Sequence, residues 1–248
     1  MTIFDSTKNL FGGCVVESGA LPGDPAEFTA RLKYSLEVWK SEGIKVVWLS
    51  VSTEKAELIK HCIAAGFEFH HTRDDILQMT LALIPGSTIP PYATHYIGAG
   101  GVVIDEQSRL LAVSERYRQS TGRRLKLPGG AVQEGEHIAA AVVREVKEET
   151  GIDARFEYLT CLRHWQGYRY GKADIYFICR LNPLSYEIHM DSNEISECLW
   201  LPLEEFLSDE NVHPFNKLIV RSAAAPRPGL SEKYISEYDK DTYELLIL

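Results

Sequence analysis

Apolar and polar residues alternate with clear periods in the first part of the chain. Over residues 25–42, apolar side chains recur every three or four positions, at Phe28, Leu32, Leu36 and Trp39. This spacing predicts a helix with one buried face. Asp24 is a suitable cap for that helix, and Pro25 fits its first turn. The β-branched run at residues 45–52 predicts a buried strand.

A second helix is predicted over residues 53–66, with Thr53 as its cap and Gly66 as the residue that ends it. Its expected inward-facing residues are Ala56, Ile59, Ile63 and Ala64. Residues 67–84 have the pattern of two strands joined by a polar turn. His70 and His71 are adjacent on the first of these strands, so they are expected to point to opposite faces.

Residues 85–95 contain three prolines and one glycine, which break regular structure. They predict a boundary between a first domain, residues 1–88, and a second, residues 89–248. The second domain is expected to contain one clear helix within residues 129–152 and several strands. Two strands are expected within 96–116, around a turn at 105–108. Further strands are expected at 156–165 and 173–181. A polar loop at 186–197 then precedes a strand-to-helix segment at 198–207. The final 25 residues are expected to form a tail or a surface extension.

Composition narrows the range of functions. The chain has 248 residues and a formal net charge of −9, so it lacks the basic surface of a duplex nucleic-acid binder. Its five cysteines are widely spaced without a CxxC pair, which argues against a disulfide framework or a zinc site. No signal peptide and no run of 18 apolar residues is seen, so the expected location is cytoplasmic, with no membrane contact.

Three glutamates lie unusually close together in the predicted helix of the second domain. Relative to Glu145, Glu148 lies at roughly −60° and Glu149 at roughly +40° around the helix. Like charges at this spacing destabilise a helix by a few tenths of a kcal/mol. One reading is a solvated face. The other is a divalent cation, because magnesium prefers carboxylate and carbonyl oxygens.

The residues around these glutamates favour the second reading. Gly130, Glu136 and the run from Arg144 to Ile152 match the Nudix box, GX5EX7REUXEEXGU with U aliphatic, at every fixed position. The chain therefore resembles the Nudix hydrolases, which split the P–O–P bridge of nucleoside diphosphate derivatives with magnesium or manganese. The resemblance implies an α/β fold of the Nudix type, an α/β/α sandwich with a mixed sheet.

The resemblance also implies roles for individual residues. Glu145, Glu148 and Glu149 correspond to the metal ligands of the family, and a backbone carbonyl at Gly129 assists them. Arg144 corresponds to the family arginine that pairs with the carboxylates of the box and orients them, and Glu136 is one of these carboxylates. A guanidinium suits this task better than an ammonium, because it binds two carboxylates at once.

Residues outside the box are less fixed by the resemblance. The catalytic base is a box glutamate in some subfamilies and a loop glutamate in others; Glu194 is the strongest candidate on the loop, where such charges otherwise simply face solvent. Lys126 and Arg124 share one face of a strand and would bind a phosphate or ribose, or else remain solvated. His164 and Trp165 would line the cleft, with Trp165 stacking on a nucleobase or packing in the core.

Similarity beyond the box extends to the subgroup with a pre-Nudix domain, such as plant ADP-ribose/NADH pyrophosphatases. It implies a small acetyltransferase-like α/β first domain and often a homodimer. ADP-ribose or NADH is the expected substrate, giving AMP and a phosphorylated product. The alternatives are a non-catalytic nucleotide-binding regulator, or an enzyme acting on CoA, a dinucleoside polyphosphate or capped RNA.

Overall fold

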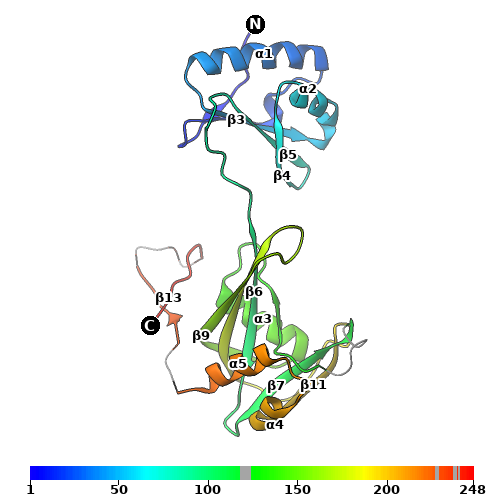
Figure 1. Ribbon diagram of the computed structural model, residues 1–248, viewed down its shortest axis with the longest axis vertical. Coiled ribbons are helices and arrows are strands. Elements are labelled where there is room, and N and C mark those ends of the chain that lie inside the picture. Colours follow the sequence, from blue (N-terminus) through cyan, green and yellow to red (C-terminus); the bar gives the residue numbers. More distant parts are fainter. Residues whose placement is uncertain (118–123, 227–228, 237–238, 240) are drawn as a thin grey trace. The chain divides into compact units, whose positions relative to one another are not determined.

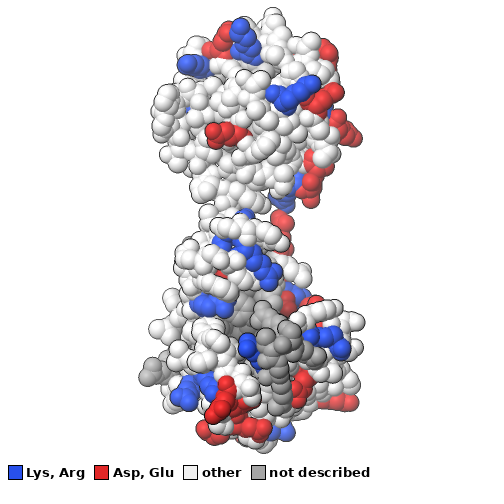
Figure 2. Space-filling view, turned by 45° about the vertical axis from the view of Figure 1, so that its right-hand side comes forward, with Lys and Arg blue, Asp and Glu red and all other residues white. Residues whose placement is uncertain are grey.

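The computed structural model describes residues 1–117, 124–226, 229–236, 239 and 241–248 (Figure 1). The chain divides into two compact units, Met1–Ala93 and Thr94–Leu248, so the boundary lies inside the proline-rich stretch. On the face shown in Figure 2, Lys and Arg side chains are interspersed with Asp and Glu. Among the described residues, no helix combines the length and apolarity needed to cross a bilayer.

The first unit is a five-stranded sheet covered by helices. Its strands lie in the order β1 (Thr7–Lys8), β2 (Cys14–Val16), β3 (Val46–Ser52), β5 (Ile76–Ala82) and β4 (Glu68–Arg73). Its helices are η1 (Ser18–Ala20), α1 (Pro25–Ser41), η2 (Thr53–Leu58) and α2 (Ile59–Ala64). β2 and β3 are parallel, whereas the other neighbouring strands are antiparallel.

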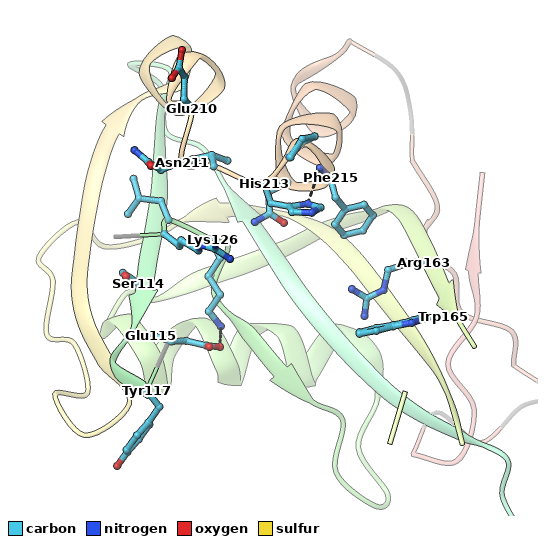
Figure 3. Close-up of a pocket in the computed structure, with 15 residues that line it drawn as sticks. Ser114, Glu115, Tyr117, Lys126, Arg163, Trp165, Glu210, Asn211, His213 and Phe215 are labelled. Carbon is cyan, nitrogen blue, oxygen red and sulfur yellow. Dashed lines mark hydrogen bonds and ion pairs between the residues drawn. The ribbon is translucent and has the colours of Figure 1, made fainter. Parts of the chain in front are cut away.

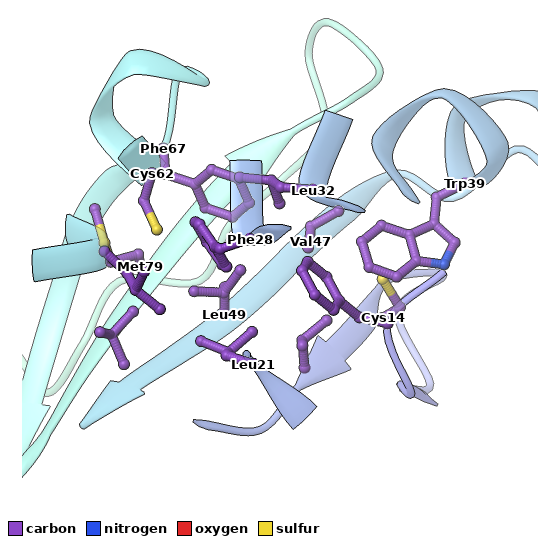
Figure 4. Close-up of a cluster of buried hydrophobic side chains, with 14 of the residues drawn as sticks. Cys14, Leu21, Phe28, Leu32, Trp39, Val47, Leu49, Cys62, Phe67 and Met79 are labelled. Carbon is purple, nitrogen blue, oxygen red and sulfur yellow. The ribbon is translucent and has the colours of Figure 1, made fainter. Parts of the chain in front are cut away.

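α1 forms as its sequence predicts. The Asp24 carboxylate accepts a hydrogen bond from the backbone N–H of Glu27 at 2.9 Å and caps the first turn. The apolar face of α1 buries Phe28, Leu32 and Trp39 against β3 residues such as Leu49 (Figure 4). All five cysteines are free, and Cys14, Cys62 and Cys179 are buried.

The inward-facing residues predicted for the second helix are wrong at three of four positions, since only Ile59 packs against the core. Ile63 is 51% exposed, and Ala56 and Ala64 are also exposed, whereas Leu58 and Cys62 are buried. The segment starts as a 3₁₀ helix that is kinked at Lys55, and only its last six residues are α-helical. Because the 3₁₀ turn has three residues, the kink shifts the buried face away from the phase expected for one continuous α-helix.

The prediction that His70 and His71 point to opposite faces is also wrong. Their Nδ1 atoms lie 2.6 Å apart. The pairing of β4 with β5 shifts register between Phe69 and His71, which marks a bulge. A bulge removes the strict alternation of side chains, so both imidazoles reach the same side of the strand.

The described residues of the second unit form three sheets and three helices. One sheet has the order β8 (Gly129–Ala131), β6 (His95–Val103), β10 (Ala173–Pro183) and β9 (Ala154–Trp165). A second pairs β11 (Ile195–Pro202) with β7 (Arg109–Glu115), and the third pairs β12 (Ser231–Glu232) with β13 (Leu246–Ile247). The helices are α3 (Ile138–Thr150), α4 (Leu203–Ser208) and α5 (Pro214–Ala224).

α3 and α5 pack on opposite faces of the first sheet (Figure 1). Val103 and Cys179 join the apolar cluster of α3, whereas Val102 and Ile178 join the cluster of α5. Neighbouring strand residues point to opposite faces, so the two clusters are separated by the sheet itself. The expected mixed α/β sandwich is present in the second unit.

The end of the chain is more ordered than its composition predicts. α5 was not anticipated, although Ile219, Val220 and Ala223 are buried. The described residues after α5 do not form a simple tail, since Leu230 and Leu246 pack against the apolar cluster of α3. Leu230 also pairs with Leu159 on β9 through two backbone hydrogen bonds of 2.8 and 3.1 Å.

Candidate functional site

The box residues occupy a short helix that ends where the sequence predicts. α3 spans Ile138–Thr150, and Gly151 takes a left-handed φ of +75° as its C-cap. Ala139, Val146 and Thr150 are buried toward the sheet. Because the apolar face fixes the rotation of the helix, the glutamates at its end have defined directions.

Arg144 connects four acceptors at the surface of α3. Its Nε and Nη2 donate to the two carboxylate oxygens of Glu136, each at 2.8 Å. Its Nη1 donates to Glu145 Oε1 and Glu148 Oε2, also at 2.8 Å, and Nη2 reaches the carbonyl of Ala131 at 3.1 Å. The hydrogen bonds from Arg144 lower the pKa of Glu136, although burial opposes this. The guanidinium thus holds the carboxylates in one place despite their mutual repulsion.

Glu149 is the most buried of the three helix glutamates. Its side chain is 8% exposed, against 14% for Glu145 and 58% for Glu148. Glu149 Oε2 accepts from the N–H of Gly129 at 3.1 Å, and Oε1 lies 3.6 Å from Lys126 Nζ. Burial raises the pKa of Glu149 to about 7, although Lys126 and the Gly129 N–H oppose this effect. A buried carboxylate with incomplete compensation is a site that favours an added cation.

Two glycines allow β8 to approach the carboxylates. Gly129 has φ of +150°, and a Cβ there would lie 2.6 Å from Tyr176 Oη. A Cβ on Gly130 would lie 2.5 Å from Glu145 Oε2. Only a bare backbone fits between the helix and the sheet at these positions. The same packing buries Glu145, and burial raises its pKa against the opposing effect of Arg144.

A cavity of about 1080 Å³ lies next to the carboxylate cluster, which it reaches through Lys126, and Figure 3 shows residues that line it. Lys126 and Glu115 line it and form an ion pair of 2.7 Å. Since Lys126 also approaches Glu149, this lysine links the cavity to the glutamate cluster. The lining residues are Ser114, Glu115, Tyr117, Arg124, Leu125, Lys126, Arg163, Trp165, Glu210, Asn211, Val212, His213, Pro214, Phe215 and Asn216.

Arg163 organises the aromatic side of the cavity. Its guanidinium carbon lies 5.3 Å from the ring centroid of Trp165 and 5.5 Å from that of Phe215. It also forms an ion pair with the buried Asp174, which fixes its position. The guanidinium over the Trp165 ring is visible in Figure 3. Two aromatic rings and a cation therefore border one wall.

The structure brings together most of the predicted site residues. Arg144 contacts both Glu145 and Glu148, and Gly129 contacts Glu149. Arg124, Lys126 and Trp165 all line the cavity.

Two predicted residues do not line the cavity. His164 is exposed and contacts His95 and Gln166, each at 3.0 Å, because it alternates with Arg163 and Trp165 on β9. Glu194 is exposed and does not line the cavity; its carbonyl accepts from the Arg116 N–H at 2.8 Å.

The donor set suits a hard divalent cation, although the carboxylates are arranged around the Arg144 guanidinium rather than around one common point. Within the described part of the chain, no three acidic, histidine or cysteine side chains converge on one point. Arg144 binds one oxygen each of Glu145 and Glu148, which leaves each carboxylate a second oxygen for another ligand. Since Glu148 is largely exposed, its carboxylate can turn toward a cation without repacking.

Sequence reasoning missed Glu115, Arg163 and Phe215. Arg163 was accessible from the sequence, because it is two residues before Trp165 on a strand and shares its face. Phe215 and Glu115 come from segments far apart in the sequence, and only the folded structure places them at the cavity.

Comparison with known proteins agrees with the box. The NUDIX domain model matches residues 94–222, and a model described as a Nudix hydrolase domain matches residues 4–83. The two matched ranges fall on the two structural units.

Individual known proteins show the same relationship over most of this chain. Nudix hydrolase 8 of Arabidopsis thaliana is 36% identical over 237 residues, which cover 94% of this chain and 64% of that protein. Nudix hydrolase 2 of Arabidopsis thaliana is 36% identical over 220 residues, 88% of this chain and 78% of that protein. Nucleoside diphosphate-linked moiety X motif 6 of Homo sapiens is 36% identical over 219 residues, 85% of this chain and 69% of that protein. The chain therefore belongs to the Nudix hydrolases, a family that uses divalent metal ions.

Proposed function

We propose that this Nudix hydrolase splits the diphosphate bridge of ADP-ribose or NADH, giving AMP and a phosphorylated product. The observation that carries the proposal is the cavity of about 1080 Å³ that adjoins the glutamate cluster through Lys126. Its size suits a ligand with two nucleoside-sized ends and a diphosphate.

Glu145, Glu148, Glu149 and the Gly129 carbonyl would hold Mg²⁺ or Mn²⁺. When bound, the cation neutralises the diphosphate and lowers the pKa of a coordinated water. Arg144 orients Glu145 and Glu148, since its Nη1 binds both carboxylates. Without this guanidinium the three glutamates would repel one another and separate.

Different cavity residues would bind different parts of the substrate. Lys126 lies between Glu115 and Glu149, where its ammonium can contact a phosphate oxygen. Arg124, an exposed residue that lines the cavity, would contact the second phosphate or a ribose. Trp165, a residue that is 48% exposed and contacts Arg163, offers an aromatic ring for stacking on a nucleobase.

Glu194 is the proposed general base, and it lies on a loop that is fixed to the end of α3. Backbone N–H groups of His189 and Asp191 donate to the carbonyls of Thr150 and Glu149, at 2.9 and 3.3 Å. This support fits a loop carboxylate that removes a proton from the attacking water. Water attacks one phosphorus, the P–O–P bridge breaks, and AMP leaves.

The proposal is tested by a substrate panel with purified protein. ADP-ribose, NADH, CoA, a dinucleoside polyphosphate and capped RNA are each incubated with Mg²⁺ or Mn²⁺, and products are separated chromatographically. We expect AMP from ADP-ribose or NADH. Tight ADP-ribose binding without any product would instead indicate a non-catalytic regulator, and turnover of another substrate alone would refute the substrate assignment.

Glu194→Gln tests the base separately. We expect kcat for ADP-ribose to fall about a hundredfold, the typical contribution of general base catalysis, with KM nearly unchanged. Glu187→Gln, an exposed carboxylate on the same loop, is the matched control. A Glu194→Gln enzyme with wild-type kcat would assign the base elsewhere.

A further inference from the structure

The first turn of α3 is capped by a distant part of the chain. His137, at the N-cap position, makes no side-chain cap hydrogen bond. Instead, the N–H groups of Ile138 and Ala139 donate to Glu244 Oε2 and Oε1, at 2.9 and 2.8 Å. One carboxylate thus satisfies two of the free N–H groups of the helix, and its charge interacts favourably with the helix dipole.

Glu244 belongs to a segment that is docked at several points. Leu230 exchanges two backbone hydrogen bonds with Leu159 on β9. β12 and β13 pair with each other, and Leu230 and Leu246 join the apolar cluster that contains Val142 and Val146 of α3. The contact with Glu244 is therefore part of an extended attachment, which we call the C-terminal clasp, comprising the described residues among 229–248.

Gly229 permits the closest approach of the C-terminal clasp to the sheet. A Cβ at this position would collide with the Tyr158 ring and would lie 2.6 Å from the Leu159 carbonyl oxygen. Both neighbours belong to β9, whose pairing with β10 fixes them. A side chain at position 229 would therefore have to push the C-terminal clasp away from β9.

The metal-binding end of α3 tolerates little displacement. A Cβ added to Gly130 would lie 2.5 Å from Glu145, and Glu149 is hydrogen-bonded to the Gly129 N–H. At the same end of the helix, a Cβ on Gly151 would lie 2.6 Å from His189 Cβ. Movement of α3 along its axis would disturb these contacts, and the two bonds from Glu244 oppose such movement at the first turn.

We propose that Glu244 is a positioning residue: by docking on the first turn of α3, it holds the helix where Glu145 and Glu149 can bind the divalent cation. This inference rests on the proposed function, since it concerns the same metal site. Docking of the C-terminal clasp and cation binding are then coupled, and each strengthens the other by thermodynamic linkage.

The first test measures the dissociation constant for Mn²⁺ by electron paramagnetic resonance at 25 °C, using the whole chain. Glu244→Ala removes both acceptors, and we expect binding about tenfold weaker, in the range of a lost helix cap. Glu244→Gln keeps one carbonyl acceptor, so its dissociation constant for Mn²⁺ should lie between those of the wild type and Glu244→Ala. Glu232→Ala removes an exposed carboxylate from β12 of the same clasp and should bind Mn²⁺ like the wild type.

Gly229→Ala provides an independent route, because it displaces the C-terminal clasp without touching α3. It should weaken Mn²⁺ binding in the same direction. With ADP-ribose as the probe, Glu244→Ala should lower kcat at limiting metal while KM for ADP-ribose and kcat at saturating metal stay near the wild-type values. A general loss of folded protein would instead lower kcat at all metal concentrations.

Hydrogen exchange of the wild-type protein tests the coupling without any substitution. Adding Mg²⁺ should increase protection of the amides of Ile138, Ala139, Leu230 and Leu246. The coupling alone would be overturned if the wild type binds Mn²⁺, Glu244→Ala binds it with the same affinity, and Mg²⁺ does not increase protection of the C-terminal clasp. Wild-type protein that binds no divalent cation would overturn the metal site and the coupling with it.

Discussion

Replacing Glu149 by Gln should stabilise the metal-free protein at alkaline pH. The carboxylate is buried beside the Gly129 N–H and the Lys126 ammonium, and burial raises its pKa from 4.5 to about 7. Below pH 4.5 it is protonated in both the folded and the unfolded chain. Between pH 4.5 and 7 the folded chain keeps a proton that the unfolded chain releases, so the free energy of unfolding falls as pH rises. Above pH 7 the full cost of the buried charge is present.

The magnitude follows from the difference in pKa. About 2.5 pKa units, at 1.36 kcal/mol each, correspond to about 3 kcal/mol lost by the wild type between pH 4.5 and 8. Because the Glu149 side chain is only 8% exposed, screening by water should reduce this value little. The amide introduced by Glu149→Gln carries no charge at any pH, so the variant lacks this loss. The difference between the two proteins isolates residue 149 from all other titrating groups.

The assay is urea unfolding in the presence of EDTA at pH values from 5 to 8. Hydrogen exchange of peptides from residues 94–248 reports the second unit, so unfolding of the first unit does not enter. Glu148→Gln removes the same charge from a side chain that is 58% exposed and should give a much smaller difference. A Glu149→Gln difference that does not change with pH would refute the reasoning that a buried carboxylate resists ionisation here.

Three further variants test the geometry of the site. Arg144→Lys keeps the charge but cannot make the five hydrogen bonds to Glu136, Glu145, Glu148 and Ala131. Its kcat with Mg²⁺ should therefore fall about a hundredfold, a typical effect of misplaced catalytic groups, and a kcat within twofold of the wild type would contradict this. Gly130→Ala brings a methyl group to 2.5 Å from Glu145 and should weaken Mn²⁺ binding, measured by calorimetry. The control variant Gly23→Ala, with no atom within 4 Å of the added carbon, should bind Mn²⁺ like the wild type. Equal affinities of the two variants would show that β8 does not restrict Glu145. Trp165→Ala should raise KM for ADP-ribose about tenfold, within the range for base stacking, with little change in kcat. Leu162 is exposed and does not line the cavity, so Leu162→Ala should leave KM unchanged. Steady-state kinetics that give the same KM for both variants would remove Trp165 from the nucleobase site.

Local signals in the sequence account for much of the fold. α1 follows from its apolar spacing and from Asp24, and α3 follows from its apolar stripe and from Gly151, because capping and periodicity act over a few residues. The hairpin turn at residues 105–108 is also local, since Asp105 accepts from the N–H groups of Gln107 and Arg109.

Other features depend on contacts that no short pattern records. The bulge that brings His70 to His71 arises from the pairing of two strands, and the 3₁₀ start of the second helix shifts its buried face. α5 is stabilised by burial of Ile219 and Val220 against the sheet rather than by a strong local signal. Phe215 reaches the cavity only because α5 packs on that face.

The site shows the same division. The box predicts which carboxylates cluster, because its spacing places them within the last turns of one helix. It does not predict that Glu149 is far more buried than Glu148, which depends on β8 and Lys126. Nor does it predict the cap from Glu244, which is 105 residues away from Ala139 in the chain.

Anomalous X-ray diffraction from crystals grown with Mn²⁺ tests the central claim most directly. We expect a manganese peak coordinated by carboxylate oxygens of Glu145, Glu148 and Glu149, at about 2.1–2.3 Å as in hard-cation sites. Crystals in which manganese is absent from these carboxylates, or lies only at other acidic residues, would contradict the assignment of this cluster as the metal site.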